Sequence, residues 1–174
     1  MPSVPPRKQL ESLHTDAFGW ALVCCERDPE AAADVLQSSY ARVLSGGAAF
    51  EGRGELRAFL FGVVRRVAQE ERRRRRRDRA RVLEFERRGA DERSIDLDGD
   101  TADALARNEE RAYLRAALDR LPTRQREVLH LAFYQGMTLH EAAAVLGIRV
   151  GSARRHYERG KAALRQRCAH LSVR

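Results

Sequence analysis

The sequence has little of several residue types that define other classes of protein. Aromatic residues make up 6% of its 174 residues, and only one is a tryptophan. There are three cysteines, Cys24, Cys25 and Cys168. An odd number, with an adjacent pair that cannot easily bridge itself, argues against a disulfide framework. Cys168 and His170 lack the second pair of ligands that a zinc site needs, so we predict no metal site.

Long apolar runs are also missing. No stretch approaches the roughly 20 apolar residues needed to cross a membrane. The first ten residues contain three prolines and two charges, unlike a signal peptide. The five histidines and the scattered carboxylates form no pairing of nucleophile and base and no metal site. We therefore expect a cytoplasmic protein that is not an enzyme, with no membrane insertion, cofactor or small-molecule substrate.

What the sequence does have is positive charge, nearly all of it from arginine. There are 33 Lys and Arg residues against 25 Asp and Glu, a net charge of +8, and Lys8 and Lys161 are the only lysines. Such a balance favours a polyanionic partner, because arginine releases counterions when it neutralises a phosphate. An anionic membrane surface would fit the same charge, and a GC-rich genome would produce the same arginine bias. Composition alone therefore favours nucleic acid without deciding it.

Apolar residues recur at helical spacing almost throughout the chain, which predicts an all-α fold. Hydrophobic residues make up 43% of the sequence, enough for a core. The N-terminal half is expected to hold three helices, over residues 9–27, 29–44 and 55–77. Asp28 and Pro29 supply the cap and the first-turn proline of the second helix. The glycine-rich loop Ser45–Gly54 follows it.

A change in composition divides the chain into two small helical domains. Residues 89–107 are rich in aspartate, glycine, serine and threonine and contain few large apolar groups, which predicts a flexible acidic linker. The domains then cover residues 1–88 and 108–174. In the second domain, Pro122 ends one helix, Thr123 is expected to cap the next, and Gly136 ends that one. The apolar stripe of this middle helix is Val128, Leu129, Leu131, Ala132 and Phe133.

The end of the chain has the pattern of a helix-turn-helix. Thr138 and Glu141 have the spacing of a capping box, and Gly147 can take the left-handed backbone of a tight turn. A last helix should run from about Gly151 to His170, with Ala153, Tyr157, Gly160 and Leu164 facing the core. Arg155, Glu158 and Arg159 should then point away from the core, with Ser152, Arg154 and His156 on the flanks. A helix with arginines in its N-terminal half can enter the major groove and read guanine edges.

The third helix has a second organised face. With its apolar stripe turned inward, Arg65, Gln69 and Arg72 are expected to project outward, with Arg66 and Arg73 beside them. Gln69 can hydrogen-bond a base edge, and the neighbouring glycine-rich loop could hold an unstacked base. The arginines at 74–77 would contact phosphates and carry no sequence information.

Together the two halves resemble the extracytoplasmic-function (ECF) sigma factors of the sigma-70 family, over about residues 13–167. Residues 28–40 resemble regions 2.1–2.2 of that family, and residues 50–70 resemble regions 2.3–2.4. In the second half, residues 118–129 are similar to region 4.1 and residues 138–164 to region 4.2. The two sets stand in the right order and are separated by the acidic linker.

The resemblance implies a mechanism. Asp34 and Gln37 would dock on the largest subunit of core RNA polymerase. The Ser45–Gly54 loop would join five side chains in binding the −10 element and a flipped base: Arg65, Arg66, Gln69, Arg72 and Arg73. The −35 element would be read by Ser152, Arg154, Arg155 and Arg159. The linker would lie in the path later taken by RNA. Core polymerase, promoter DNA and an anti-sigma factor are the implied partners.

Some positions depart from the family pattern. Ser38 stands where an acidic residue is usual, Phe59 replaces a frequent tryptophan, and Arg66 replaces a frequent asparagine that helps to read the −10 bases. His156 and Tyr157 replace a commoner Arg-Leu pair.

Two other classes of protein remain open from the residues alone. A helix-turn-helix regulator acting without polymerase would explain residues 112–170 but would give Asp34 and Gln37 no role. An arginine-rich RNA-binding or ribosome-associated protein would explain the charge and would tolerate scrambling of the last helix.

Overall fold

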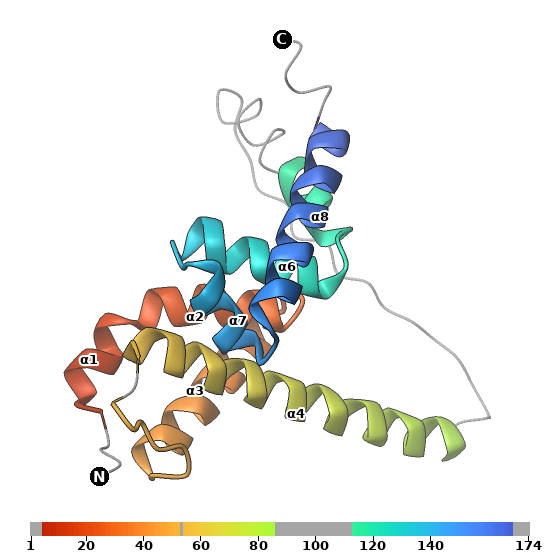
Figure 1. Cartoon of the computed structure of the whole chain (residues 1–174). Coiled ribbons are helices and arrows are strands. Elements are labelled where there is room, and N and C mark those ends of the chain that lie inside the picture. Colours follow the sequence, from red (N-terminus) through yellow and green to blue (C-terminus); the bar gives the residue numbers. More distant parts are fainter. Residues whose placement is uncertain (1–4, 53, 86–112, 169–174) are drawn as a thin grey trace, which may run out of the picture.

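The computed structural model describes residues 5–52, 54–85 and 113–168 (Figure 1). These residues form helices joined by loops, which confirms the all-α prediction. Residues 5–85 are called the N-terminal half below and residues 113–168 the C-terminal half. The predicted linker, residues 89–107, lies outside the described residues. The helices are α1 (Arg7–Ser12), α2 (His14–Cys24), α3 (Pro29–Leu44), α4 (Leu56–Phe85), α6 (Thr123–Leu129), η1 (His130–Tyr134), α7 (Leu139–Leu146) and α8 (Val150–Cys168), and residues 113–119 are also helical.

The start of the chain differs from the prediction. Instead of one helix over residues 9–27, Leu13 separates α1 from α2, and α2 ends at Cys24. The turn that follows places Glu26 and Arg27 in the left-handed region, with φ of 56° and 67°. Each non-glycine residue there costs on the order of 1 kcal/mol or more. The predicted start of α3 is confirmed, because the Asp28 side chain accepts a hydrogen bond from the Ala31 N–H at 3.0 Å and Pro29 is the first helical residue.

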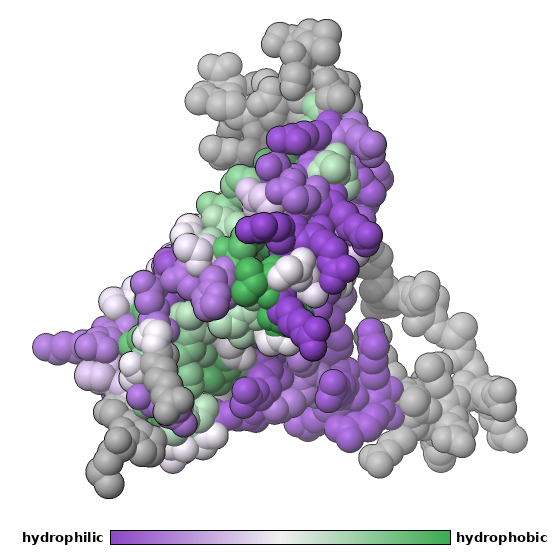
Figure 2. All heavy atoms as spheres, viewed as in Figure 1, coloured by the Kyte–Doolittle hydropathy of each residue, from purple (hydrophilic) through white to green (hydrophobic). Residues whose placement is uncertain are grey.

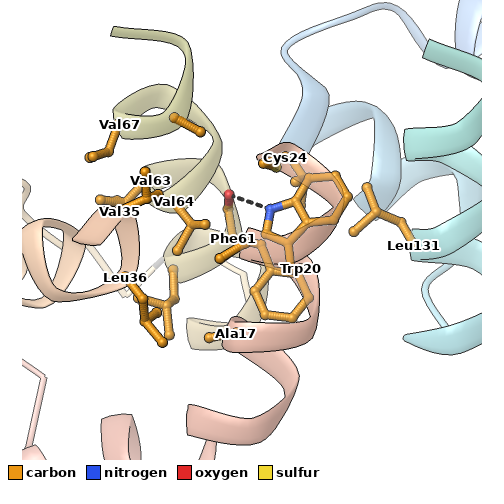
Figure 3. Close-up of a cluster of buried hydrophobic side chains, with 14 of the residues drawn as sticks. Ala17, Trp20, Cys24, Val35, Leu36, Phe61, Val63, Val64, Val67 and Leu131 are labelled. Atoms are coloured by element: carbon orange, nitrogen blue, oxygen red, sulfur yellow. Dashed lines mark hydrogen bonds between the residues drawn. The ribbon is translucent and has the colours of Figure 1, made fainter. Parts of the chain in front are cut away.

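The core of the N-terminal half is built around Trp20, which is completely buried. Its indole N–H donates to the backbone carbonyl of Phe61 at 3.0 Å, so the one polar atom of the ring is satisfied (Figure 3). The two rings stack with their centroids 6.0 Å apart. This pair joins α2 to α4, and α3 packs on both through Val35, Leu36 and Val43. The predicted apolar stripe of α4 therefore faces the core.

The middle of the C-terminal half contains a wide turn that the periodicity did not predict. Residues His130–Tyr134 form a π-helix that continues α6. A π-turn holds an extra residue, so the side chains that follow move to another face of the helix. Phe133, which we predicted in the apolar stripe, is accordingly 61% exposed. The expected cap at Thr123 is also wrong, because Pro122 occupies the cap position and no side-chain capping bond forms.

The helix-turn-helix pattern is confirmed in its details. Glu141 N–H donates to Thr138 Oγ1 at 3.2 Å, and Thr138 N–H donates to the Glu141 carboxylate at 2.7 Å, which completes the capping box. Gly147 adopts a left-handed backbone with φ of 59°. α8 begins at Val150, one residue earlier than expected, and crosses α6 closely at Gly160. A Cβ atom at Gly160 would lie 2.8 Å from Leu129 Cδ1, so no larger residue fits there without a shift.

The two halves pack against each other. Val128, Leu131 and Leu146 of the C-terminal half belong to the same cluster of buried apolar side chains as Trp20 and Leu60. α7 lies against α4 (Figure 1), and Leu131 lies beside the Trp20 ring (Figure 3). The domain boundaries that we predicted at residues 88 and 108 remain a prediction. In this conformation the halves share one core.

Candidate nucleic-acid interface

The exposed side of α8 carries the residues predicted to read DNA. Arg154, Arg155 and Arg159 are exposed and Ser152 is half-buried. Arg155 Nη2 lies 3.4 Å from Ser152 Oγ, which places the two side chains together on one face. The opposite side is held by the fully buried Ala153 and by Gly160. The orientation of this helix is therefore fixed by packing, and its hydrophilic side faces solvent (Figure 2).

The α4 face, formed by Arg65, Arg66, Gln69, Arg72 and Arg73, is only partly open. Arg66 and Arg73 are exposed, whereas Gln69 and Arg72 are half-buried. Arg65 is only 7% exposed, so the prediction that it projects outward is wrong for this conformation. The physical reason is a contact with the C-terminal half, since Arg65 Nε donates to Glu127 Oε1 at 3.2 Å.

Arg65 and Glu127 form a buried ion pair between the two halves. Their side chains are 9% and 6% exposed. The Gln69 amide, oriented with its oxygen toward Arg65, accepts from both terminal guanidinium nitrogens at 3.1 and 2.6 Å. Glu127 Oε2 accepts from Arg124 at 2.9 Å. Removing one partner of such a pair typically costs about 3–5 kcal/mol, because the other charge stays buried.

The electrostatics of Glu127 follow from its position. Burial raises the pKa of its carboxyl above the usual value, and the neighbouring Arg124 and Arg72 only partly oppose that shift. Because burial disfavours the charged form of Glu127, its ionised carboxylate depends on the neighbouring arginines for stabilisation. If the two halves separated, Arg65 would become available to another acceptor.

Arg72 has a structural contact of its own. It donates to the backbone carbonyl of Cys24 at 2.6 Å and lies 3.5 Å from a carboxylate oxygen of Glu26. Arg75, in the same basic run, is 3.7 Å from Asp28. These contacts tie the middle of α4 to the turn between α2 and α3. The residues of the α4 face with free access to solvent are thus Arg66 and Arg73.

The residues expected to bind polymerase lie together. Asp34 and Gln37 are exposed on α3, three positions apart and therefore on one face, and Ser38 beside them is exposed as well. α3 is held from its other side by Val35 and Leu36.

The glycine-rich loop lies next to the start of α4. Gly46, Gly52 and Gly54 have positive φ values of 77°, 71° and 77°, which L-residues rarely adopt. Phe50 packs against Phe59 of α4 with ring centroids 5.2 Å apart. The glycines are therefore required by the path of the loop, and Phe50 holds that path against the first turns of α4.

One surface was missed by the sequence reasoning. An apolar groove with a volume of about 1240 Å³ lies between the two halves, lined among others by Leu22, Leu118 and Phe133. Arg27 Nε donates to Asp119 Oδ1 across it at 2.8 Å. The groove exists only because the halves meet and because the π-turn exposes Phe133. No local pattern in the sequence signals either event.

Cys24 and Cys25 lie away from the DNA-reading helix α8, whereas Cys168 is the last residue of that helix. All three are within the described residues and are free. Cys24 is buried, and burial raises its pKa well above the usual value. Burial also raises the pKa of Cys25 to about 11, although Arg72 and Arg75 pull it down. Both thiols are therefore protonated at neutral pH.

Residues 5–52, 54–85 and 113–168 offer neither a membrane-spanning helix nor a cluster of metal ligands. None of the helices there combines the length and the apolar character required to cross a membrane. The same residues contain no group of three or more His, Cys, Asp or Glu side chains placed to hold a metal ion.

The sequence matches two family models in the expected order. Sigma-70 region 2 matches residues 10–78, and Sigma-70 region 4 matches residues 111–164. The ECF RNA polymerase sigma factor SigX of Bacillus subtilis is 31% identical over 157 residues, which cover 90% of this chain and 79% of SigX. The chain belongs to the ECF sigma factor family. The ECF sigma factor EcfG of Rhodopseudomonas palustris is 32% identical over 137 residues, covering 75% of this chain and 67% of EcfG.

Solved structures agree with this ECF sigma factor fold. The sigma factor RpoE of Bartonella quintana, in complex with the anti-sigma factor NepR, superposes with a TM-score of 0.67 over 96% of each chain at 20% identity. CnrH, in complex with the cytosolic domain of CnrY, superposes with a TM-score of 0.59 at 25% identity, over 95% of this chain and 87% of CnrH. The region 2 match accounts for the N-terminal half, which a stand-alone helix-turn-helix regulator leaves unexplained. The protein is a transcription initiation factor.

Proposed function

We propose that this ECF sigma factor binds core RNA polymerase through α3 and brings it to promoters by contacting two separate DNA elements. The observation that carries this proposal is the presence of two arginine-bearing surfaces on different helices, α8 and α4, in a chain that matches both sigma regions. Two surfaces of this kind suit two sites on the same duplex.

The −35 element is assigned to α8. Arg155 and Arg159 can each donate two hydrogen bonds to a guanine edge. Ser152 and Arg154 lie beside them at the start of the helix. Their exposure supports this role, because the helix can enter a major groove without rearrangement of the C-terminal half.

The −10 element is assigned to the α4 face together with the Ser45–Gly54 loop. Arg66 and Arg73 are exposed and can bind phosphates or bases, and Gln69 and Arg72 lie beside them. Arg65 belongs to this set once it leaves Glu127. The neighbouring loop is proposed to receive a base that leaves the stack as the strands separate.

The polymerase contact is assigned to Asp34 and Gln37. An anti-sigma factor is proposed as a further partner, supported by the RpoE structure, in which that sigma factor is bound to NepR.

Run-off transcription tests the proposal directly. Purified core polymerase and this protein, supplied with a library of genomic promoter fragments, should give defined start sites that neither component gives alone. Asp34→Asn should weaken binding to core polymerase and lower the yield from every promoter equally. Glu11→Gln is the matched control, since it removes one exposed carboxylate from α1 instead of α3. An absence of defined start sites with intact protein and active core would refute the assignment.

A further inference from the structure

Glu158 is the only carboxylate residue of α8, and the proposed function gives it no role. Its side chain is 61% exposed. A negative charge on a surface that meets DNA repels the phosphates of the duplex and weakens binding. A carboxylate in this place therefore requires a compensating contact with the DNA.

Glu158 lies at the centre of the exposed side of α8. Ala153 and Gly160 are buried and define the opposite side of the helix. Arg155 and Glu158 are three positions apart, so their side chains are neighbours on the surface. The residues directly across from the buried side form an exposed row at helical spacing, called the central row below: Gly151, Arg155, Glu158 and Ala162.

The two ends of the central row are small. A Cβ atom at Gly151 would meet nothing within 4 Å, so packing within the chain does not require a glycine there. Ala162, at the other end, is exposed as well. Small residues at both ends let the helix approach the base edges closely, with Arg155 and Glu158 as the side chains that reach furthest. The middle of the central row thus presents one hydrogen-bond donor group and one acceptor group.

The neighbouring cations leave the Glu158 carboxylate available. Arg155 is turned toward the start of the helix, with its Nη2 3.4 Å from Ser152 Oγ. Lys161 Nζ lies 3.9 Å from Glu158 Oε2, but the same ammonium group is also 5.0 Å from the centre of the Tyr157 ring. An exposed ion pair of this length contributes little to stability. A helix-stabilising pair with Lys161 therefore does not account for Glu158.

The chemistry of the major groove indicates what Glu158 can bind. An ionised carboxylate only accepts hydrogen bonds, and the donors in that groove are the amino groups of cytosine and adenine. Adenine places its N7 acceptor beside the amino group, where it would repel the second carboxylate oxygen, whereas cytosine has a C–H group there. Three residues of an α-helix advance about 4.5 Å and one base-pair step about 3.4 Å. Arg155 and Glu158 can therefore reach base pairs that are close neighbours.

We propose that Glu158 determines specificity at the −35 element by accepting a hydrogen bond from the amino group of a cytosine, close to the guanine bound by Arg155. This inference rests on the proposed assignment of the −35 element to α8. The carboxylate acts in two ways, because it stabilises the complex with a duplex that carries the cytosine and repels a duplex that lacks it. The −35 element should then contain a cytosine within one or two base pairs of a guanine.

The test uses holoenzyme assembled from core polymerase and the full chain. A promoter mapped by run-off transcription is randomised in its −35 element, and the fragments that the holoenzyme binds are sequenced. The unchanged protein should favour cytosine at one position. Replacing that cytosine in a single promoter should weaken binding by about 5- to 150-fold, the effect of one good base contact.

Two substitutions of Glu158 give different expected results. Glu158→Gln should change the preference at this position from cytosine to adenine, because a glutamine amide accepts from the adenine amino group and donates to N7. Preferences at the other positions should remain. Glu158→Ala should accept any base at this position and should bind an unrelated duplex more tightly at fixed salt, because the repelling charge is gone.

Two further variants are controls. Glu11→Gln removes an exposed carboxylate from α1 and should change neither the base preferences nor the affinity for the unrelated duplex. Lys161→Gln removes the ion-pair partner of Glu158 and should keep the preference for cytosine. The circular dichroism melting curve of Glu158→Gln should match that of the unchanged protein, which separates a lost base contact from a damaged helix.

The outcomes separate this inference from the proposed function. The role of Glu158 is overturned if no −35 position favours cytosine, if Glu158→Gln keeps the cytosine, or if Lys161→Gln loses it equally. It is also overturned if Glu158→Ala relaxes every position at once. Defined start sites and a −35 preference together with any of these results would leave the sigma activity and the assignment of α8 standing. Absence of any −35 preference in the unchanged holoenzyme would refute the assignment of α8 and the role of Glu158 together.

Discussion

His130 lies between two aromatic rings where the two halves meet, with centroids 5.7 Å from Trp20 and 5.3 Å from Tyr134. Burial lowers its pKa from 6.5 to about 4, and the charge of Arg27 acts in the same direction. The imidazole is therefore neutral at pH 7 and packs as an aromatic ring. A proton on it would place an unpaired charge beside the indole of Trp20.

We expect the free energy of unfolding to fall as the pH is lowered from 7 to 5. Unfolded His130 takes up its proton near pH 6.5 and folded His130 only near pH 4, so in that window the unfolded state binds more protons. The stabilisation is complete above pH 6.5 and is lost toward pH 4, with an upper limit on the order of 3 kcal/mol. Glu127, whose pKa is raised, acts in the opposite sense and reduces the net effect.

Urea unfolding at both pH values measures this change. His130→Phe keeps an aromatic ring against Trp20 and has no proton to gain, so its stability should differ less between pH 7 and pH 5. An unchanged pH dependence in this variant would assign the effect to another group.

At the residue scale, the burial of Arg65 is what the sequence did not predict. Helical periodicity correctly placed Val63, Val64 and Val67 in the core. It also placed Arg65 in solvent, because periodicity considers one helix against one core. The partner that buries Arg65 is Glu127, 62 positions later in the chain. A contact between residues so far apart leaves no local pattern in the sequence. The burial of Arg65 could therefore not be predicted, whereas the exposure of Arg66 and Arg73 could.

At the scale of elements, α7 and α8 were the most predictable part of the molecule. Their limits depend on local chemistry, namely a capping box at Thr138 and a left-handed glycine at 147, and each signal is complete within a few residues. The start of η1 could not be predicted, because a π-turn has no distinctive composition and depends on how its side chains pack. The break at Leu13 was missed for a similar reason, since the apolar spacing continues across it.

The recognition helix gives the element-scale prediction. Arg155→Ala and Arg159→Ala should each weaken binding to a promoter obtained from run-off transcription by roughly 1–3 kcal/mol, the value of a bidentate contact to a base. Fluorescence anisotropy with the promoter duplex and with an unrelated duplex measures the difference. Arg165→Ala, exposed in the last turn of the same helix, is the control and should change both duplexes little. Equal losses on both duplexes for Arg155 and Arg159 would assign these arginines to phosphates.

At the scale of the whole molecule, the two matched sigma regions were predictable and their packing was not. The amphipathic pattern shows which side of a helix is apolar but not which partner will cover it. Val128 and Leu131 were expected to face the core of their own half. They lie instead in a cluster shared with Trp20 and Leu60 of the other half.

Because the core is shared, we expect the free protein to unfold in one transition. Far-ultraviolet circular dichroism reports all helices and Trp20 emission reports the contact between the halves, so the two urea curves should coincide. Leu131→Ala removes apolar contact beside Trp20 and should destabilise the protein by about 2–5 kcal/mol. In this variant the change in Trp20 emission should also occur at a lower urea concentration than the loss of the helical circular dichroism signal. Separate transitions in the unchanged protein would show that the halves are thermodynamically independent.

The burial of Cys24 and Cys25 has a consequence for the signals that this sigma factor can sense. With a pKa of about 11, the Cys25 thiol is protonated at pH 7. Peroxides and electrophiles react with the thiolate and hardly at all with the neutral thiol. Oxidative stress is therefore poorly registered by this pair of residues, which leaves Cys168, at the end of α8, as the remaining cysteine that could respond to an oxidant.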